Sequence, residues 1–592
     1  MHEEKSLYMN ALECIPMSKI LREEHGMYLL PQPTMIKEKE GFLKTKVLKI
    51  DNKCSDERII NALRFFETGD GADLIIEAGT DNSEGYSLSV SENKIHIKGE
   101  SPAGVFYAIQ TLRQLFESNK VPCLEIEDKP DMMLRGFYHD VTRGKVPTVK
   151  TLKRLIDDMA YYKLNCLQLY VEHTFEFKEY SDSIDRTGYL TAEEIKELDE
   201  YCRLNFIEFI PSLATFGHLY ELLQKDRYSH LRELENYESK NIVWHDRMMH
   251  HTIDPTNEES FELIKSLLDQ YIVNFSTDKF NICCDETFDL KIGKHKDDDT
   301  GKLYVDFVRK IIEYLQSKGK GVMMWADILL NHPEQIESLP DGVELLNWFY
   351  AENPDESTIK TIYESGLPQI VCPGTGTWNR LSENYETEIL NIEKMIDLGY
   401  KYKATGVLNT NWGDWGNPCS IELAMFGLLF GASKSWNVST MADDEYISSV
   451  NNILYKSNNA CMLIKRLAQI SQTCDWCSLA KSYWNDLKGQ IYDVSFKSEQ
   501  DLINSVNECF SVIETAENSE WGEARYKNQI ILAAEGYAVI AELLAKQAGY
   551  SVHRRTDADK WVEKYKAAWL EDNKESELRE IEKMFSYLEQ CK

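Results

Sequence analysis

Two acidic residues stand side by side at the end of an apolar run, where the segment FNICCDETFDL places Asp285 directly before Glu286. Such a pair either caps a helix, with the second acid in solvent, or forms a reaction centre. Because successive side chains of a regular strand point to opposite faces, both carboxyls reach one pocket only where the strand ends or bulges. The polar loop that begins at Thr287 favours such an ending.

Aromatic and charged residues also stand where other apolar runs stop. In chain order they are Asp140, Arg143, Glu172, His173, His218, Trp325, Asp327, Trp348, Tyr350, Trp378, Trp412, Asp414 and Trp415. Aromatic walls with carboxylates and one arginine between them suit a sugar pocket, because pyranose rings offer apolar C–H faces and a rim of hydroxyls. A purely structural tryptophan cluster would not explain the charged groups beside the rings, so the pattern favours a carbohydrate site.

Eight apolar strand candidates, separated by helical patterns, carry these residues. They read LRGFYHD, CLQLYVE, FIEFIPSL, KFNICCDE, GVMMWAD, VELLNWFY, PQIVCPG and TGVLNTNWGD. Strands that are buried on both faces read as continuous apolar runs, and a (β/α)8 TIM barrel gathers its chemistry at their C-terminal ends. A doubly wound open sheet is the alternative, but no glycine-rich phosphate loop follows the first strand. We expect an α/β fold with a TIM barrel over residues 131–437.

The barrel is flanked by two further segments. Residues 1–130 alternate strand-like and helix-like runs, which predicts an N-terminal α+β domain, and a charged stretch containing Pro130 ends it. Residues 438–592 show helical periodicity and no strand signal, which predicts a C-terminal α-helical domain. This domain either packs on the barrel or builds a homodimer, and its pattern does not choose between them.

The composition limits the class of partner. The formal net charge of −32 argues against a nucleic-acid or anionic-membrane footprint, which would need a basic face. No run of about 18 apolar residues occurs, and the N-terminal segment lacks the pattern of a secretory signal, so we expect a cytoplasmic location. The 14 cysteines are scattered, which predicts buried thiols and not a disulfide framework or a zinc site.

Several ordered motifs resemble glycoside hydrolase family 20, the β-N-acetylhexosaminidases. They are AGVFYAIQTLRQLF, LRGFYHDVTR, MAYYKLNCLQLY, IEFIPSLATFGH, DPTNEESFELIKSLLDQ followed by FNICCDE, MMWAD and NTNWGD. The resemblance implies an exo-acting, retaining enzyme that removes terminal β-linked GlcNAc or GalNAc from an oligosaccharide or glycoconjugate. In that family the substrate's own 2-acetamido oxygen attacks the anomeric carbon, so the enzyme supplies no nucleophile. No metal or organic cofactor is implied.

The resemblance assigns roles to the catalytic candidates. Glu286 would be the general acid and then the general base, with its pKa raised for that task. Asp285 would accept the acetamide N–H and balance the charge of an oxazolinium-like intermediate. His218 would lie behind Glu286 and set its orientation.

It also assigns the sugar contacts. Arg143 would bind O3 and O4 of the terminal sugar, and Asp414 would accept a hydrogen bond from O4 or O6. The acetamide and the ring would be walled by Trp325, Trp348 and Trp412.

The chain departs from the family pattern at several strand ends. It has Ser212 and Ala214 where the third-strand motif usually carries acids, and Cys283 and Cys284 where two glycines usually precede the acid pair. The second strand lacks the usual Asp-rich turn, so Glu172 becomes the candidate support for His218. The seventh strand usually supplies a tyrosine for the acetamide oxygen. Here it offers Trp378, and Tyr350 from the sixth strand is the expected substitute.

Two other interpretations remain. One is another acetamido-assisted glycosidase with two Asp, such as a family 84 enzyme, against which the Asp-Glu order and the WGD ending weigh. The other is a catalytically inactive sugar-binding protein. Such a protein would not need to keep Asp285 and Glu286 together with Arg143 and Asp414.

Overall fold

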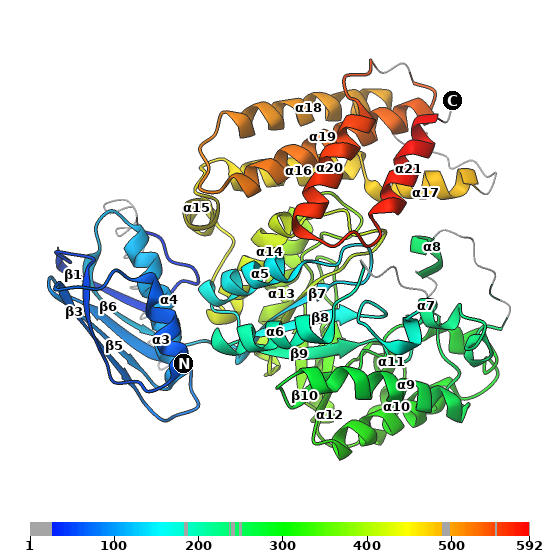
Figure 1. Cartoon of the computed structure of the whole chain (residues 1–592), viewed down its shortest axis with the longest axis horizontal. Helices are drawn as coiled ribbons and strands as arrows, with labels where there is room; N and C mark the ends of the chain where they lie inside the picture. The colour runs from blue at the N-terminus through cyan, green and yellow to red at the C-terminus, as the bar shows by residue number, and fades with distance from the viewer. Residues whose placement is uncertain are drawn as a thin grey trace, which may run out of the picture.

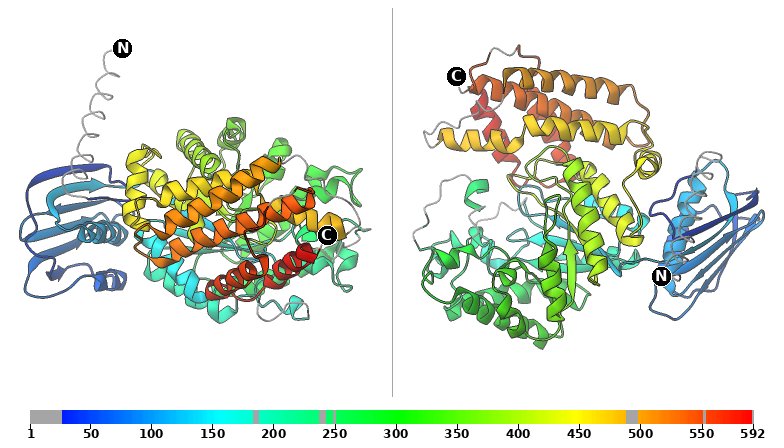
Figure 2. Two further views of the ribbon diagram at one scale, coloured as in Figure 1. Left: turned by 90° about the horizontal axis from the view of Figure 1, so that it is seen from above. Right: turned by 180° about the vertical axis from the view of Figure 1, so that it is seen from behind.

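Three bodies of secondary structure make up the chain (Figure 1). The computed structural model describes residues 27–182, 188–235, 237, 243–247, 251–487, 498–550 and 553–590. A sheet domain lies to one side of a closed barrel, and a bundle of helices covers the barrel from above in Figure 1; Figure 2 shows the same arrangement from two other directions.

The N-terminal body is a six-stranded sheet with a helical layer. The strand order is β1 (Met35–Phe42), β6 (Pro122–Asp128), β4 (Tyr86–Val90), β5 (Lys94–Gly99), β3 (Ala72–Ala78) and β2 (Leu48–Asn52). The main helix, α4 (Pro102–Glu117), begins where the Ser101 side chain accepts the N–H of Gly104, and it packs on the sheet beside α3 (Glu57–Ala62).

Eight parallel strands close into the predicted barrel. They are β7 (Leu134–Asp140), β8 (Cys166–Val171), β9 (Glu208–Leu213), β10 (Lys279–Asn281), β11 (Gly321–Trp325), β12 (Val343–Trp348), β13 (Gln369–Cys372) and β14 (Gly406–Asn411). Pairing of Gly406 with Leu134 joins the last strand to the first. Parallel strands bring their carboxyl ends to one rim, which places the predicted site residues there.

Helices between the strands cover the barrel. The longer ones are α5 (Val149–Tyr161), α6 (Ala192–Leu204), α9 (Glu258–Tyr271), α10 (Thr300–Ser317), α12 (Glu356–Ser365), α13 (Tyr385–Lys401) and α14 (Met425–Trp436). Short helices lie in the loops at the rim: α7 (Tyr220–Leu223), α8 (Val243–Arg247) and α11 (Asp327–Asn331).

The fourth strand is shorter than its apolar run. The run continues to the acid pair, but β10 ends at Asn281, whose side chain accepts the N–H of Cys283 at 2.9 Å. Cys283, Cys284 and Glu286 then have positive φ angles of 57°, 64° and 49°. The predicted interruption of the strand is therefore present, and it is a left-handed turn.

The C-terminal body is helical, as predicted. Its helices are α15 (Asp444–Val450), α16 (Ala460–Thr473), α17 (Trp476–Leu487), α18 (Glu499–Glu517), α19 (Ala524–Gln547), α20 (Ala558–Asp572) and α21 (Leu578–Gln590). Among the described residues α19 alone is long and apolar enough to cross a membrane, but 78% of its most apolar stretch is buried, as in the core helix of a bundle. The cysteines in the described ranges are all free, and all but Cys477 are buried.

Two buried carboxyls lie between the barrel and its last helix. Glu383 and Glu388 are 0% and 1% exposed, and Glu383 accepts the N–H of Gly427 in α14 at 3.2 Å. Burial raises the pKa of Glu383 to about 8, although its hydrogen bonds with Gly427 and Glu388 act to lower the pKa. Burial and the neighbouring Glu383 raise the pKa of Glu388 well above its ordinary value. The pair therefore holds at least one proton at neutral pH.

We expect this pair to make the fold less stable as the pH rises from about 5 to about 8. When folding raises the pKa of a carboxyl, the free energy of unfolding falls as the pH rises from the unfolded pKa, near 4.5, through the folded pKa, near 8. Glu388→Gln, which mimics the protonated acid, should reduce the loss of unfolding free energy between pH 5 and pH 8 by about 1–3 kcal/mol. Urea unfolding at both pH values measures this, and parallel pH curves for wild type and variant would contradict the assignment.

Candidate active site

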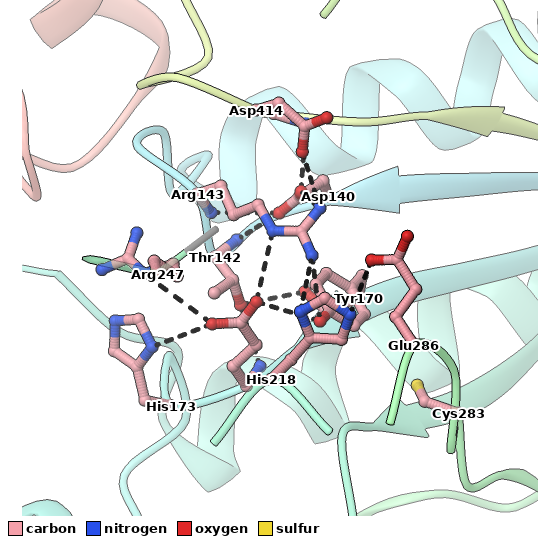
Figure 3. A network of polar contacts seen from close by, with 12 residues as sticks. Asp140, Thr142, Arg143, Tyr170, His173, His218, Arg247, Cys283, Glu286 and Asp414 are labelled. Carbon is pink, nitrogen blue, oxygen red and sulfur yellow. Dashed lines mark hydrogen bonds and ion pairs between the residues drawn. The ribbon is translucent and has the colours of Figure 1, made fainter. Parts of the chain in front are cut away.

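Arg143 lies at the centre of the polar network at the C-terminal rim of the barrel (Figure 3). Its Nη1 lies 2.7 Å from Asp414 Oδ1, and its Nε lies 3.2 Å from Glu172 Oε1. The three side chains come from the ends of β7, β14 and β8. The arginine side chain is only 9% exposed, so its charge depends on these carboxylates.

Asp140 fixes the loop that carries this arginine. One of its carboxylate oxygens accepts the N–H groups of Thr142 and Arg143, at 2.9 and 3.0 Å. The other accepts the N–H of Gly413 at 3.0 Å, directly before Asp414. A single buried carboxylate thus sets the spacing between the two predicted sugar-binding residues.

His218 joins the two adjacent acids. Its Nε2 lies 3.3 Å from Asp285 Oδ2 and 3.3 Å from Glu286 Oε2. The left-handed turn therefore brings both carboxyls to the same imidazole nitrogen, which a regular strand could not do. The Asp285 side chain is 9% exposed and that of Glu286 is 27% exposed, so Glu286 is the more accessible acid.

The surroundings of His218 favour a positively charged imidazole. Burial alone lowers its pKa, but the charge of Asp285 and hydrogen bonds to Asp285 and Glu286 raise the pKa to about 10. Arg143, whose Nη2 lies 3.3 Å from Nδ1, acts against this protonation. Glu172 accepts the Nε–H of Arg143. Its predicted role as a support for His218 stays a prediction.

The turn before the acid pair is built from residues that disfavour it. Non-glycine residues rarely adopt positive φ, and such strain collects at functional sites. The Cys283 Sγ lies 3.3 Å from Ser212 Oγ, and the Cys284 Sγ lies 3.3 Å from Thr215 Oγ1. Burial raises the pKa of both thiols, so they are neutral packing groups and not nucleophiles.

Asp327 is a site residue to which the sequence assigned no role. Its Oδ2 accepts the N–H of Glu286 at 3.0 Å and so holds the backbone of the acid pair. Burial and the charge of Asp285 raise the pKa of Asp327 to about 8. The available signal was its position at a strand end, two residues after Trp325.

Aromatic rings form a wall beside the acids. The centroids of Trp325 and Trp412 are 5.9 Å apart, and Tyr138 lies 5.2 Å from each of them. Tyr170 lies 5.2 Å from Trp412 and donates its hydroxyl to Glu172. Tyr138 and Tyr170 were not predicted, because an inward aromatic residue in a strand reads as ordinary core.

A second aromatic group continues this wall. Trp348 and Tyr350 stack at 5.1 Å, and Trp378 lies 5.0 Å from Tyr350. Trp412 donates its indole N–H to the Tyr350 hydroxyl at 2.7 Å. Trp325, Trp348, Tyr350, Trp378 and Trp412 are therefore connected in one aromatic group. The role of Tyr350 toward an acetamide oxygen stays a prediction.

Among the described residues, two groups of side chains have ligand atoms close enough for a metal ion. One is the catalytic set of His218, Asp285 and Glu286. A protonated imidazole cannot bind a metal, so the charge on His218 disfavours this use. The other group is Glu233, Asp254 and His295, in which His295 Nδ1 lies 2.8 Å from Glu233 and Lys294 pairs with Asp254 at 3.2 Å. These ion pairs already satisfy its carboxylates.

Comparison with known protein families agrees with this geometry. The model of the glycosyl hydrolase family 20 catalytic domain matches residues 133–405, and the model of domain 2 of the same family matches residues 61–129. Together they match more than half of the chain. The protein belongs to glycosyl hydrolase family 20.

The relatives are distant. A lacto-N-biosidase of Bifidobacterium bifidum is 22% identical over 460 residues, which cover 74% of this chain and 37% of that protein. A β-hexosaminidase of Porphyromonas gingivalis is 27% identical over 283 residues, covering 42% of this chain and 36% of the relative. The structure of a chitobiase from Flavobacterium johnsoniae has a TM-score of 0.60 at 18% identity and covers 95% of this chain and 99% of its own, which shows a shared fold. The two sequence matches cover little more than a third of the length of each curated relative.

The charge of His218 can be measured directly. Because Asp285 is the main cause of its raised pKa, Asp285→Asn should lower the pKa of His218 from about 10 toward its ordinary 6.5. NMR of the ¹⁵N-labelled imidazole as a function of pH measures both values. A wild-type His218 that is neutral at pH 7.5 would contradict the described electrostatics.

Proposed function

We propose that this protein is an exo-acting, retaining β-N-acetylhexosaminidase that removes terminal β-linked GlcNAc or GalNAc by substrate-assisted catalysis. The observation that carries the proposal is the shared contact of Asp285 and Glu286 with one nitrogen of His218, beside a buried arginine and a wall of tryptophans. The family membership and the β-hexosaminidase among the relatives support it.

In the first step Glu286 acts as the general acid. Its carboxyl donates a proton to the glycosidic oxygen while the substrate's acetamide oxygen forms a bond to the anomeric carbon. The bond to the leaving group breaks, and an oxazolinium-like intermediate forms. Asp285 accepts the acetamide N–H, and its negative charge balances the positive charge that develops.

In the second step Glu286 acts as the general base. Its carboxylate takes a proton from water, the water oxygen bonds to the anomeric carbon, and the bond to the acetamide oxygen breaks. Two inversions give net retention, and Glu286 regains its proton. Glu286 thus carries the proton in both steps, while Asp285 serves as the acceptor of the acetamide N–H.

The rim residues account for the sugar contacts. Arg143, held by Glu172 and Asp414, is suited to the O3 and O4 hydroxyls of a terminal sugar, and Asp414 to O4 or O6. The tryptophan wall suits the apolar face of the ring and the acetamide methyl group. A catalytically inactive sugar-binding protein is the second candidate, but sugar binding alone gives no reason for Asp327 to hold the backbone of the acid pair.

Activity assays test the proposal. The purified protein should release p-nitrophenol from the β-N-acetylglucosaminide or the β-N-acetylgalactosaminide and not from the plain β-glucoside. Glu286→Gln should lower kcat by about 10²–10⁴-fold, because it removes the general acid. Glu337→Gln, which changes an exposed glutamate, is the matched control and should leave the rate unchanged. Cleavage of the plain glucoside at a similar rate would rule out acetamide participation.

Asp327 provides a finer test. Since its pKa of about 8 keeps it protonated at neutral pH, Asp327→Asn preserves both its charge and an oxygen that accepts the N–H of Glu286. We expect Asp327→Asn to keep kcat within about threefold and Asp327→Ala to lose about 10–100-fold. Equal losses in the two variants would show that an ionised Asp327 is required.

A further inference from the structure

A turn of the C-terminal domain lies against the segment that carries Arg143. We call residues 572–577, between α20 and α21, the C-terminal turn, and residues 143–148 the arginine segment. Four hydrogen bonds join them. Thr148 donates its N–H to Asp572 O at 3.0 Å and Lys574 donates its N–H to Val146 O at 2.8 Å, while the Ser576 hydroxyl and, at 3.5 Å, the Glu577 N–H both donate to Gly144 O. The helical domain is thus bonded to the backbone next to the predicted sugar-binding arginine.

Glu577 extends this contact toward the site. Its carboxylate lies 2.6 Å from Arg247 Nη2 and accepts the indole N–H of Trp244 at 3.0 Å. The Trp244 ring in turn packs on Gly416, where a Cβ atom would come within 2.5 Å of the ring. Gly416 lies two residues after Asp414. Glu577 therefore contacts the arginine segment directly and the loop of Asp414 through Trp244.

Arg247 completes a path of charges to Arg143. Its side chain is 2% exposed, and its Nε lies 3.7 Å from Glu172 Oε2. The other oxygen of Glu172 accepts the Nε–H of Arg143 at 3.2 Å. Alternating charges therefore run from Glu577 through Arg247 and Glu172 to Arg143, and both arginines are labelled in Figure 3.

We propose that the C-terminal turn positions Arg143 for sugar binding, with Glu577 as the positioning residue. The proposal rests on the proposed hexosaminidase function of the same site. Arg247 also pairs with Glu221 at 3.1 Å, but Glu577 is its nearer partner at 2.6 Å, and a buried cation that loses its nearest carboxylate is drawn toward the remaining ones. Without Glu577, Arg247 draws Glu172 away from Arg143, and the guanidinium loses the orientation that the O3 and O4 hydroxyls require.

A purely structural role for Glu577 is the competing explanation. Another ion pair joins the same two domains, from Arg525 Nη2 in α19 to Asp158 Oδ2 in α5 at 3.4 Å, and within the described part of the chain neither residue contacts Arg143. If Glu577 only holds the domains together, neutralising Glu577 and neutralising Asp158 should have the same kinds of effect. Asp158→Asn is therefore the matched control.

Two measurements test the proposal on the full chain. With p-nitrophenyl β-N-acetylglucosaminide, Glu577→Gln should raise KM about tenfold and change kcat less than about threefold, because the lost interaction is with the bound sugar. Amide hydrogen exchange of the arginine segment should become faster in the same variant. Asp158→Asn should change neither quantity. Trp244→Phe, which removes the N–H donor to Glu577 together with the part of the indole ring that packs on Gly416, should change both in the direction of Glu577→Gln.

The outcomes separate this proposal from the function on which it rests. Unchanged exchange in the arginine segment of a folded Glu577→Gln variant would overturn it, as would an unchanged KM or an equal response to Asp158→Asn. If the wild-type protein cleaves no N-acetylhexosaminide, the proposed function fails. The exchange comparison then decides by itself whether the C-terminal turn orders the arginine segment.

Discussion

A buried guanidinium group constrains the whole rim of the barrel. Taking a charge such as that of Arg143 out of water costs several kcal/mol unless carboxylates compensate for it closely. Asp414 and Glu172 supply that compensation from two strands, and Asp140 fixes the backbone on which the arginine stands. The ends of β7, β8 and β14 must therefore meet in one arrangement, which holds the guanidinium at the C-terminal rim of the barrel.

The acid pair depends on a second constraint, which is a strained turn. Cys283 and Cys284 occupy left-handed backbone positions, at a cost of about 1–3 kcal/mol each. The turn persists because both thiols are packed among Ser212, Thr215 and Tyr138, and because Asp327 holds the N–H of Glu286. The strain has a chemical use, since it directs two consecutive carboxyls to His218 and gives them different surroundings.

Much of this arrangement could be predicted from sequence. Barrel strands buried on both faces read as apolar runs, and the polar residues that stop those runs mark the functional rim, which is why the acid pair, Arg143 and Asp414 were found. The end of β10 was placed too late, because the letters Ile-Cys-Cys are apolar in a strand and in a buried turn alike. Arg247 and Glu577 were missed for another reason. They come from a loop and from a distant domain, and no strand end or periodicity marks residues that meet only through tertiary packing.

In the proposed mechanism the acetamide group of the substrate is the nucleophile. The most direct measurement is kcat/KM of the wild-type protein for p-nitrophenyl β-glucosaminides whose N-acetyl group carries zero, one, two or three fluorine atoms. Fluorine withdraws electrons from the carbonyl oxygen and makes it a weaker nucleophile. If that oxygen attacks the anomeric carbon, kcat/KM should fall steeply and continuously along the series. Rates that hardly change with fluorination would contradict it and would point to a nucleophile supplied by the protein.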